Sequence, residues 1–301
     1  MYQLNIKKPM KRDFTKLYCF VDDFIKNSEY NILAIVSCKS KTGVSNYLNK
    51  SEVLTILIGF YQSSFDCFKN YYKQQILVEH RDDFKLVTYE HFTKLIGRCL
   101  PYLPILLNSI FDKCSGMSFV DSTSIAVCKN YRIYSHKVFK GLANRSKTTK
   151  GWFYGLKIHL VINLEGGLVK ASFSSGNKDD RAHFKTMISN IYGKVFGDRG
   201  YISKPLFDEL MAKGIQLVTR IKKGMKNKLM SISDKLMLLK RTLIETVIGR
   251  MKLLDKLEHS RHRSPINAFS HMVACLVNYQ LLEQKPSIKS LVQLDDLITA
   301  N

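Results

Sequence analysis

The sequence predicts an α/β domain with a mixed β-sheet, preceded by an all-helical N-terminal region. Apolar residues recur at helical spacing from about residue 13 to 112. Near Ser115-Gly116 the period becomes that of a β-strand. From there the predicted elements follow in the order strand, strand, strand, helix, strand, helix, strand, helix. An order of this kind is typical of a mixed sheet covered by helices.

The helical region consists of short amphipathic segments joined by short turns. Leu17 and Val21 belong to the first apolar stripe, Ser51 is expected to cap the next helix, and a further helix is predicted to start near Thr88. Short helices joined by turns are typical of helix-turn-helix DNA-binding modules and of ordinary helical bundles alike. Residues 1–114 are therefore assigned as a helical N-terminal region, for which both interpretations stay open.

The predicted sheet begins with three strands. Residues 117–127 form the first, and residues 154–163 form the second because their apolar and polar side chains alternate cleanly. Glu165-Gly166-Gly167 is a hairpin turn that leads into the third strand, residues 168–174. The later elements alternate between helix and strand: a helix over 180–192, a strand holding Val195, Phe196 and Asp198, a helix over 203–213, a strand over 216–221, and helices over 234–257 and 264–283.

These elements assign residues 115–284 to one α/β domain. Ser264 and Pro265 are expected to start the last helix as N-cap and first helical residue, and this helix is predicted to close the core. Residues 285–301 are assigned as a peripheral tail.

The charge of the chain points to a polyanionic partner. Among 301 residues, 47 Lys and Arg stand against 25 Asp and Glu, a formal net charge of +22. Such a globule repels itself unless a polyanion shares its surface, so nucleic acid is the first partner to consider. No apolar run approaches the roughly 20 residues of a membrane-spanning helix, and the start of the chain lacks a signal-peptide core. We expect a soluble, intracellular protein.

The seven cysteines are scattered and form no Cys-x-x-Cys pair. This pattern indicates neither a disulfide framework nor a zinc site. They are expected to be small buried hydrophobic residues in a reducing compartment.

Three acidic residues stand in unlike local settings: Asp121 in Phe-Val-Asp-Ser-Thr, Asp198 in Phe-Gly-Asp-Arg-Gly-Tyr, and Glu245 within a predicted helix. The two aspartates belong to predicted strands, where Asp is depleted and its desolvation needs a compensating partner. If the three carboxylates converge at one edge of the sheet, their oxygens suit Mg²⁺ or Mn²⁺. Two such ions about 4 Å apart can promote an in-line phosphoryl displacement.

Helical phase places Arg241, Glu245 and Lys252 on one stripe of the predicted helix. The apolar residues expected on the opposite side are Leu236, Leu239, Leu243, Val247 and Leu254. On its own, the charged stripe is better explained by a solvated face with an Arg241–Glu245 pair worth a few tenths of a kcal/mol.

These motifs together carry a family resemblance. Asp121, the Gly-Asp-Arg-Gly-Tyr block at 197–201, and Arg241-x3-Glu245-x6-Lys252 resemble the DDE transposases of bacterial insertion sequences, whose catalytic domain has the ribonuclease H-like fold. The resemblance extends to the segments 151–157 and 258–263, and it covers roughly residues 115 to 283. Many members of the group carry Tyr three residues before the Arg, where this chain has Leu238.

The resemblance implies a ribonuclease H-like fold, a set of roles and an activity. Asp121, Asp198 and Glu245 are similar to the family's catalytic, metal-binding triad, with Mg²⁺ or Mn²⁺ and two ions, and Arg241 and Lys252 to its DNA-contacting residues. The implied enzyme is a transposase that hydrolyses a phosphodiester at each end of its own element and joins the freed 3′ hydroxyl to target DNA. Its partners would be double-stranded DNA, as terminal inverted repeats and target, and further copies of the chain in a dimer or larger synaptic complex. Its place would be the bacterial cytoplasm, in association with the nucleoid.

Three alternatives remain from the sequence. The first is a related nuclease that cuts without joining. The second is a transposase-derived DNA-binding protein without catalytic activity. The third is a basic protein that scaffolds RNA.

Two basic segments flank the expected active edge, one over 129–150 without any acid and one directly after the last predicted strand. The residues expected to contact DNA, besides Arg241 and Lys252, are Lys137, Lys140, Lys150, Lys157, Arg199, Lys222 and Lys223. Within the first segment, Tyr131, Tyr134 and Phe139 can either stack on unpaired bases or pack against the domain.

A few other residues invite a functional role, but a structural one is expected for each. Trp152 is predicted to lie in the core. Asp179 and Asp180 stand at a predicted helix start, which favours capping over metal binding. His159 is predicted to be packed or hydrogen-bonded rather than catalytic.

Overall fold

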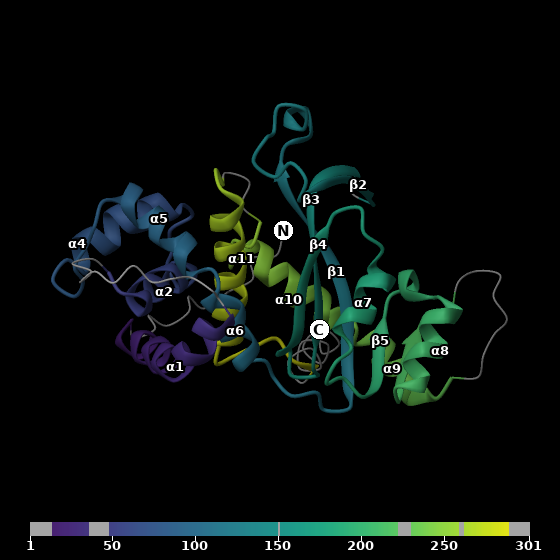
Figure 1. Ribbon diagram of the computed structural model, residues 1–301. Helices are drawn as coiled ribbons and strands as arrows, with labels where there is room; N and C mark the ends of the chain where they lie inside the picture. The colour runs from purple at the N-terminus through teal and green to yellow at the C-terminus, as the bar shows by residue number, and fades with distance from the viewer. Residues whose placement is uncertain (1–13, 36–47, 150, 222–229, 259–261, 289–301) are drawn as a thin grey trace, which may run out of the picture. The chain divides into compact units, whose positions relative to one another are not determined.

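The computed structural model describes residues 14–35, 48–149, 151–221, 230–258 and 262–288 (Figure 1). The chain divides into two compact units. A helical unit comprises residues 1–109 and 263–281, and a sheet unit comprises residues 110–262 and 282–301. Within the described ranges, no helix has both the length and the apolar character needed to cross a membrane.

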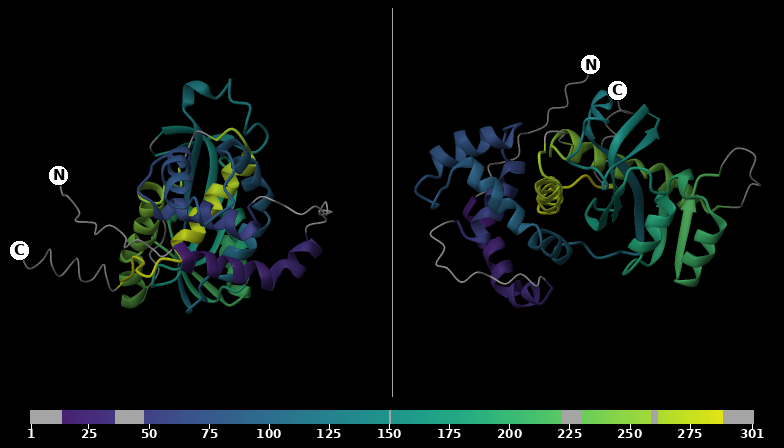
Figure 2. Two further views of the ribbon diagram at one scale, coloured as in Figure 1. Left: turned by 90° about the vertical axis from the view of Figure 1, so that its left-hand side faces the viewer. Right: turned by 45° about the horizontal axis from the view of Figure 1, so that its top comes forward.

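The helical unit is built around its last helix. Its longer helices are α1 (Phe14–Ile35), α2 (Lys50–Gly59), α5 (Tyr89–Cys99), α6 (Tyr102–Ser109) and α11 (Pro265–Gln280), with the short turns η1 (Phe60–Gln62), α3 (Phe68–Asn70), η2 (Tyr71–Ile76, π-helical) and α4 (Leu77–Glu79) between α2 and α5. α11 packs against α2, α5 and α6, as Figure 2 shows for the yellow helix among the blue ones. The hydroxyl of Tyr61 donates to the carbonyl oxygen of His271 at 2.7 Å.

The grouping of α11 differs from the expected domain limits at 114 and 284. Ser264 and Pro265 begin the helix as expected, with the Ser264 side chain accepting from the amide of Asn267. However, α11 closes the core of the helical unit, because it packs against α2, α5 and α6 and every side chain from Ser270 to Gln280 is buried. Beyond residue 288 the expected tail lies outside the described residues.

Of the helix starts expected at Ser51, Thr88 and Ser264, the last two are caps in the structure. Thr88 caps α5 by accepting from the amide of His91. Asn49, not Ser51, caps α2, because its side chain accepts from the amide of Glu52 while the Glu52 carboxylate accepts in return from the amide of Asn49. This reciprocal pair is a capping box. Ser51 is the second residue of the helix, and its hydroxyl donates to Asp22.

The sheet unit contains a mixed sheet of six strands. These are β1 (Met117–Cys128), β2 (Asn144–Thr148), β3 (Gly151–Ile162), β4 (Leu168–Ser175), β5 (Gly193–Gly197) and β6 (Ile215–Thr219). Their order is β2-β3-β1-β5-β6, with β4 paired to the same edge of β3 as β2. β3 pairs antiparallel with β1, β2 and β4, whereas β1, β5 and β6 run parallel. This order and these directions confirm the predicted ribonuclease H-like fold.

Helices lie against both faces of the sheet, and the short turns η3 (Asn130–Arg132) and η4 (Arg199–Tyr201) follow β1 and β5. α7 (Asp180–Met187) and α8 (Lys204–Ala212) cover the face that carries Val120 and Val161, which pack with Phe184 and Leu206 in one buried cluster. α9 (Ile232–Leu239) contacts β5 and β6, and α10 (Thr242–Leu253) contacts β1. Because successive side chains of a strand alternate between faces, Asp121 lies on the face opposite Val120.

The long helix predicted over 234–257 is two helices. α9 ends at Leu239 and α10 begins at Thr242, with Arg241 as its N-cap. Helical phase holds only within one continuous helix, so the expected apolar stripe is interrupted. Leu236 and Leu239 are 55% and 57% exposed and Leu254 is also exposed, whereas Leu243 and Val247 are fully buried.

β2 was not predicted, because its residues Asn144 to Thr148 are polar and lack an apolar alternation. It is an edge strand held by pairing with β3. At the junction of β2, β3 and β1, Gly155 approaches a neighbouring strand closely. A Cβ atom there would lie 1.9 Å from the carbonyl oxygen of Ile125, so only glycine fits beside the irregularity of β1 at Ala126 to Cys128.

Candidate active site

The parallel pairing of β1 with β5 brings Asp121 and Asp198 to the same edge of the sheet. Phe119 is in register with Phe196, so two residues further along each strand Asp121 lies next to Asp198. Neighbouring strands are about 4.8 Å apart. Asp198 directly follows β5 and caps the short helix η4, where its carboxylate accepts from the amide of Arg199 at 2.6 Å.

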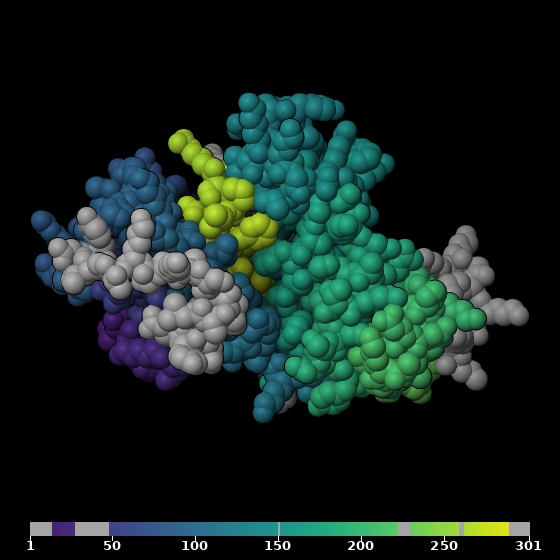
Figure 3. Space-filling view, in the orientation of Figure 1, coloured from purple at the N-terminus to yellow at the C-terminus, as the bar shows by residue number. Residues whose placement is uncertain are grey.

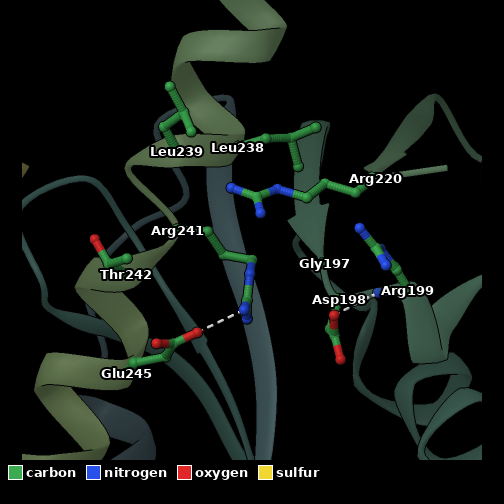
Figure 4. A pocket seen from close by; sticks show the side chains of 9 residues that line it. All are labelled: Gly197, Asp198, Arg199, Arg220, Leu238, Leu239, Arg241, Thr242 and Glu245. Atoms are coloured by element: carbon green, nitrogen blue, oxygen red, sulfur yellow. Dashed lines mark hydrogen bonds and ion pairs between the residues drawn. The ribbon is translucent and has the colours of Figure 1, made fainter. Parts of the chain in front are cut away.

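Arg241 connects Asp121 to the third acidic residue. Its Nη2 donates to Oε1 of Glu245 at 2.5 Å, and its Nη1 donates to Oδ2 of Asp121 at 3.2 Å. Figure 4 shows the guanidinium of Arg241 between the carboxylates of Glu245 and Asp198. The three carboxylates named from the sequence therefore come from β1, the end of β5 and α10, and they surround one arginine side chain.

Asp121 is a desolvated carboxylate. Burial raises its pKa from 3.8 to about 6, and the charge of Asp198 adds to the rise. The amide of Ser122, which donates to Oδ1 at 2.8 Å, and the guanidinium of Arg241 lower the pKa in opposition. The Ser122 amide and the Arg241 guanidinium together thus limit the rise in the pKa of Asp121 that burial causes.

A pocket of about 390 Å³ opens beside these residues (Figure 4). It is lined by Gly197, Asp198, Arg199, Arg220, Leu238, Leu239, Arg241, Thr242 and Glu245. Three arginines thus accompany two carboxylates, an arrangement that suits a phosphate oxygen held near an acidic centre. Leu238, which stands where many family members have Tyr, is a buried part of this lining.

Arg220, which belongs to the second basic segment, also lines the pocket. Gly197 is in register with Thr219 in the parallel pair of β5 and β6, so the next residues, Asp198 and Arg220, follow their strands at the same edge. The available signal was its position at the end of the last predicted strand, because the carboxyl ends of parallel strands meet at one edge of a sheet.

Lys252 lies along β1 at the far end of α10. Its Nζ donates to the carbonyl oxygen of Ser124 at 2.5 Å and is 3.5 Å from Oε2 of Glu258. Glu258 also accepts from the amide of Ala126 at 3.0 Å. Lys252 is therefore held against β1 at Ser124, three residues after Asp121.

The donor set fits a hard divalent cation in its chemistry. Three carboxylates offer only oxygen ligands, which Mg²⁺ and Mn²⁺ prefer. Among the described residues, no three Asp, Glu, His or Cys side chains are close enough together to hold a metal ion in their present positions. Two of these carboxylates, Asp121 and Glu245, are instead each paired with the guanidinium of Arg241.

The other residues expected to contact DNA fall into three groups. Lys137, Lys140 and Arg199 are exposed. Lys157 is engaged within the protein, since its Nζ donates to Oδ1 of Asp180 at 2.8 Å and to the carbonyl oxygen of Lys178 at 3.0 Å. The remaining three lie outside the described residues: Lys150, Lys222 and Lys223.

The structural roles expected for neighbouring residues are partly met. Asp179 caps α7 by accepting from the amide of Arg181, whereas Asp180 binds Lys157 and accepts from the hydroxyl of Ser122 at 2.9 Å. His159 is buried and its Nε2 is 2.8 Å from the hydroxyl of Ser174. Trp152, expected in the core, is 50% exposed because it lies at the edge where β3 pairs with the polar strand β2.

Comparison with known proteins gives a family. No curated protein matches the chain. Among solved structures, one similar chain is that of a piggyBac transposase synaptic complex with hairpin DNA, with 10% sequence identity, a TM-score of 0.47, and coverage of 97% of this chain and 80% of that one. A family model described as the transposase DDE domain matches residues 111–265, more than half of the chain. Domains of this family generally use divalent metal ions. The chain therefore belongs to the transposase DDE-domain family and is a DNA transposase.

Proposed function

We propose that this transposase hydrolyses a phosphodiester at each end of its own element and joins the freed 3′ hydroxyl to target DNA, with Asp121, Asp198 and Glu245 as the catalytic carboxylates. One observation carries the proposal. A single guanidinium, that of Arg241, is hydrogen-bonded to both Asp121 and Glu245, while Asp198 lies at the adjoining strand end. Acidic groups gathered in this way within a chain of net charge +22 suit metal-assisted phosphoryl transfer.

The three carboxylates would hold Mg²⁺ or Mn²⁺, two ions in all. Asp121 and Asp198 would share the ions, and Glu245 would complete the second site. When bound, the ions would activate the attacking oxygen and stabilise the leaving oxygen of the displacement. Arg241, released from the carboxylates, would then donate to an oxygen of the DNA backbone.

The cations around the pocket would position the DNA strand. Arg199 and Arg220 line the pocket beside Asp198. Lys252 lies against β1 at Ser124, three residues after Asp121. Each would contact a phosphate without reading sequence. The exposed lysines Lys137 and Lys140, together with Lys150, Lys222 and Lys223, would extend this contact to the flanking duplex. Because two DNA ends are processed together, a dimer or larger synaptic assembly is part of the proposal.

The test requires the element's own ends. Inverted repeats in the DNA flanking the coding region would supply a labelled duplex, to be incubated with the full chain and Mg²⁺ or Mn²⁺. We expect nicked ends and, with added target DNA, joined product. Asp121→Asn, Asp198→Asn and Glu245→Gln should each abolish both products and leave DNA binding largely intact. Asp208→Asn, which removes an exposed acid on α8, is the matched control and should cleave normally.

Each other outcome favours another activity. Nicked product without joined product would indicate a nuclease. Binding without cleavage by the parent chain would indicate a DNA-binding protein that has lost catalysis. Preference for structured RNA over duplex ends at matched salt would indicate an RNA scaffold.

A further inference from the structure

A basic segment extends from the end of the sheet that β1 reaches after Asp121. We call residues 129–149, together with the first residues of β3 up to Trp152, the arm; it contains η3 and β2. It stands at the top of Figures 1 and 3 as a projection from the sheet unit. The function proposed above makes no use of its aromatic residues.

The arm has its own small buried centre. Phe139 and Ala143 are each 2% exposed, the ring of His136 stacks on that of Phe139, and the hydroxyl of Tyr154 donates to the carbonyl oxygen of Phe139 at 3.3 Å. Of the two interpretations of Phe139, the structure thus favours packing. The backbone around it is held in place, so residues on the outside of the arm are presented from a fixed support.

Three aromatic side chains remain on the outside. Tyr131 is 78% exposed, Tyr134 is 93% exposed and Trp152 is 50% exposed. Large rings left in water contribute little to folding, and neighbouring exposed aromatic residues are typical of a binding surface.

The charge of the arm selects the class of partner. The segment 129–149 carries no acid and six cations: Lys129, Arg132, Lys137, Lys140, Arg145 and Lys147. The guanidinium of Arg145 lies 4.5 Å from the centroid of the Trp152 ring and the Nζ of Lys147 lies 5.9 Å from it. A second copy of the chain, also +22, would be repelled by this surface, whereas a nucleic-acid strand would be attracted.

Rings and cations together favour unpaired nucleotides over an intact duplex. In a duplex the faces of the bases are stacked on one another, and only phosphates and groove edges are accessible. In a single strand each base offers a face on which an aromatic ring can stack, while its phosphate is available to a cation. To bind the phosphate backbone of a duplex, lysines would suffice and exposed aromatic residues would not be needed.

The distance from the acidic site matches a short unpaired stretch. Seven residues of β1 separate Asp121 from Cys128, where the arm begins. At about 3.3 Å per strand residue this is about 23 Å, a length that about seven nucleotides cover when their bases stay stacked at about 3.4 Å each. We propose that the arm binds unpaired nucleotides of a DNA end held at the acidic site, with Tyr131, Tyr134 and Trp152 stacked on bases and the cations on phosphates. The relation to the cleaved end rests on the proposed function; the preference for unpaired nucleotides does not.

Trp152 is the single tryptophan of the chain, so the protein's tryptophan fluorescence reports on the arm alone. The full chain would be titrated in EDTA, which prevents cleavage, with a single-stranded oligonucleotide and with a blunt duplex of the same sequence at equal salt. We expect the single strand to quench Trp152 strongly, and the duplex to bind, as seen by anisotropy of a label on the DNA, with little quenching. A duplex with about seven unpaired terminal nucleotides should bind more tightly than either.

Variants separate stacking from charge. Replacing both Tyr131 and Tyr134 by Ser should weaken single-strand binding at least tenfold and leave duplex binding within about twofold. The matched control replaces both by Phe, which retains the rings and should bind like the parent. Replacing Lys137 and Lys140 by Gln should instead weaken both DNA forms and reduce the salt dependence by about two phosphate contacts.

The results also distinguish this proposal from the catalytic one. Asp121→Asn should lose cleavage and keep the Trp152 response. Equal quenching by duplex and single strand, or no quenching by either, would overturn the role of the arm whether or not the chain cleaves DNA. A strong single-strand response in a chain that never cleaves would support the arm's preference and count against the proposed chemistry.

Discussion

Arg241 donates from Nη1 to Oδ2 of Asp121 at 3.2 Å across 120 positions of sequence. The contact pairs a cation at the start of α10 with a carboxylate whose pKa burial raises to about 6. An ion pair of this kind compensates for the desolvation of the Asp121 carboxylate, so no metal ion is needed to keep it in the folded chain. Arg241 therefore acts as the cation of the site in the structure described here.

Removing Arg241 should destabilise the chain through Asp121. Arg241→Leu leaves a mostly buried carboxylate without its partner, and we expect a loss of about 1–3 kcal/mol in the free energy of unfolding at pH 8 in EDTA, measured with urea. Asp121→Asn in the same background should recover most of the loss. If the double variant is as unstable as Arg241→Leu, the two side chains do not interact as the structure indicates.

Divalent metal should replace the arginine. Mn²⁺ or Mg²⁺ at 100 times its dissociation constant should stabilise the folded parent by about 2.7 kcal/mol, seen as a rise in melting temperature. Because metal and Arg241 compete for the same carboxylates, Arg241→Leu should gain more than the parent. Asp198→Asn should gain least, and Asp208→Asn should respond like the parent. An equal response in all four proteins would place metal binding elsewhere.

Lys157 should serve stability more than DNA affinity. Its Nζ is bound to Asp180, and the side chain is only 18% exposed. We expect Lys157→Gln to lower the free energy of unfolding by about 1 kcal/mol while duplex affinity and its salt dependence remain unchanged. Exposed Lys140, replaced by Gln, provides the comparison with the reverse behaviour. A weaker salt dependence for Lys157→Gln would instead restore the DNA contact expected from the sequence.

His159 should make the sheet unit sensitive to acid. Burial lowers its pKa from 6.5 to about 4, and the neighbouring charges of His183 and Lys157 add to the decrease while Asp180 opposes it. The unfolded chain therefore binds a proton below pH 6.5 that the folded chain binds only near pH 4. Stability present above pH 6.5 is lost as the pH falls towards 4, by up to about 3 kcal/mol from this group.

The measurement is the free energy of unfolding as a function of pH. His159→Gln should show a smaller loss between pH 6.5 and 4 than the parent, whereas His91→Gln, in the helical unit, should follow the parent. Parallel curves for all three proteins would show that His159 titrates normally in the folded state.

Much of the sheet could be predicted because its signal is local. β1, β3 and β4 carry alternating apolar side chains, and their limits fall within about three residues of those expected. The same local signal was missing in β2, whose polar residues pair only because β3 lies beside them. It was also missing at Lys240 and Arg241, where the helix breaks although no proline or glycine marks the position.

The partners of individual side chains could not be read from local pattern. Asp179 and Asp180 are adjacent in sequence, yet their partners differ. Asp179 caps α7, while Asp180 binds Lys157 on β3 and Ser122 on β1. Lys157, expected to contact DNA, pairs with Asp180 in the structure. Which partner Lys157 takes depends on which acidic group lies within hydrogen-bonding distance, about 3 Å, of its Nζ after folding.

By itself, the sequence predicted the class of protein, which the family match confirms, and it named the acidic residues proposed as catalytic, because strand aspartates and the Arg-x3-Glu-x6-Lys spacing are properties of short segments. Only the tertiary structure decided that Arg241 stands between Asp121 and Glu245, that α11 belongs to the helical unit, and that Trp152 lies exposed beside Arg145. These depend on contacts between residues far apart in the chain. Their energies come from burial and charge in the assembled fold, which no single segment contains.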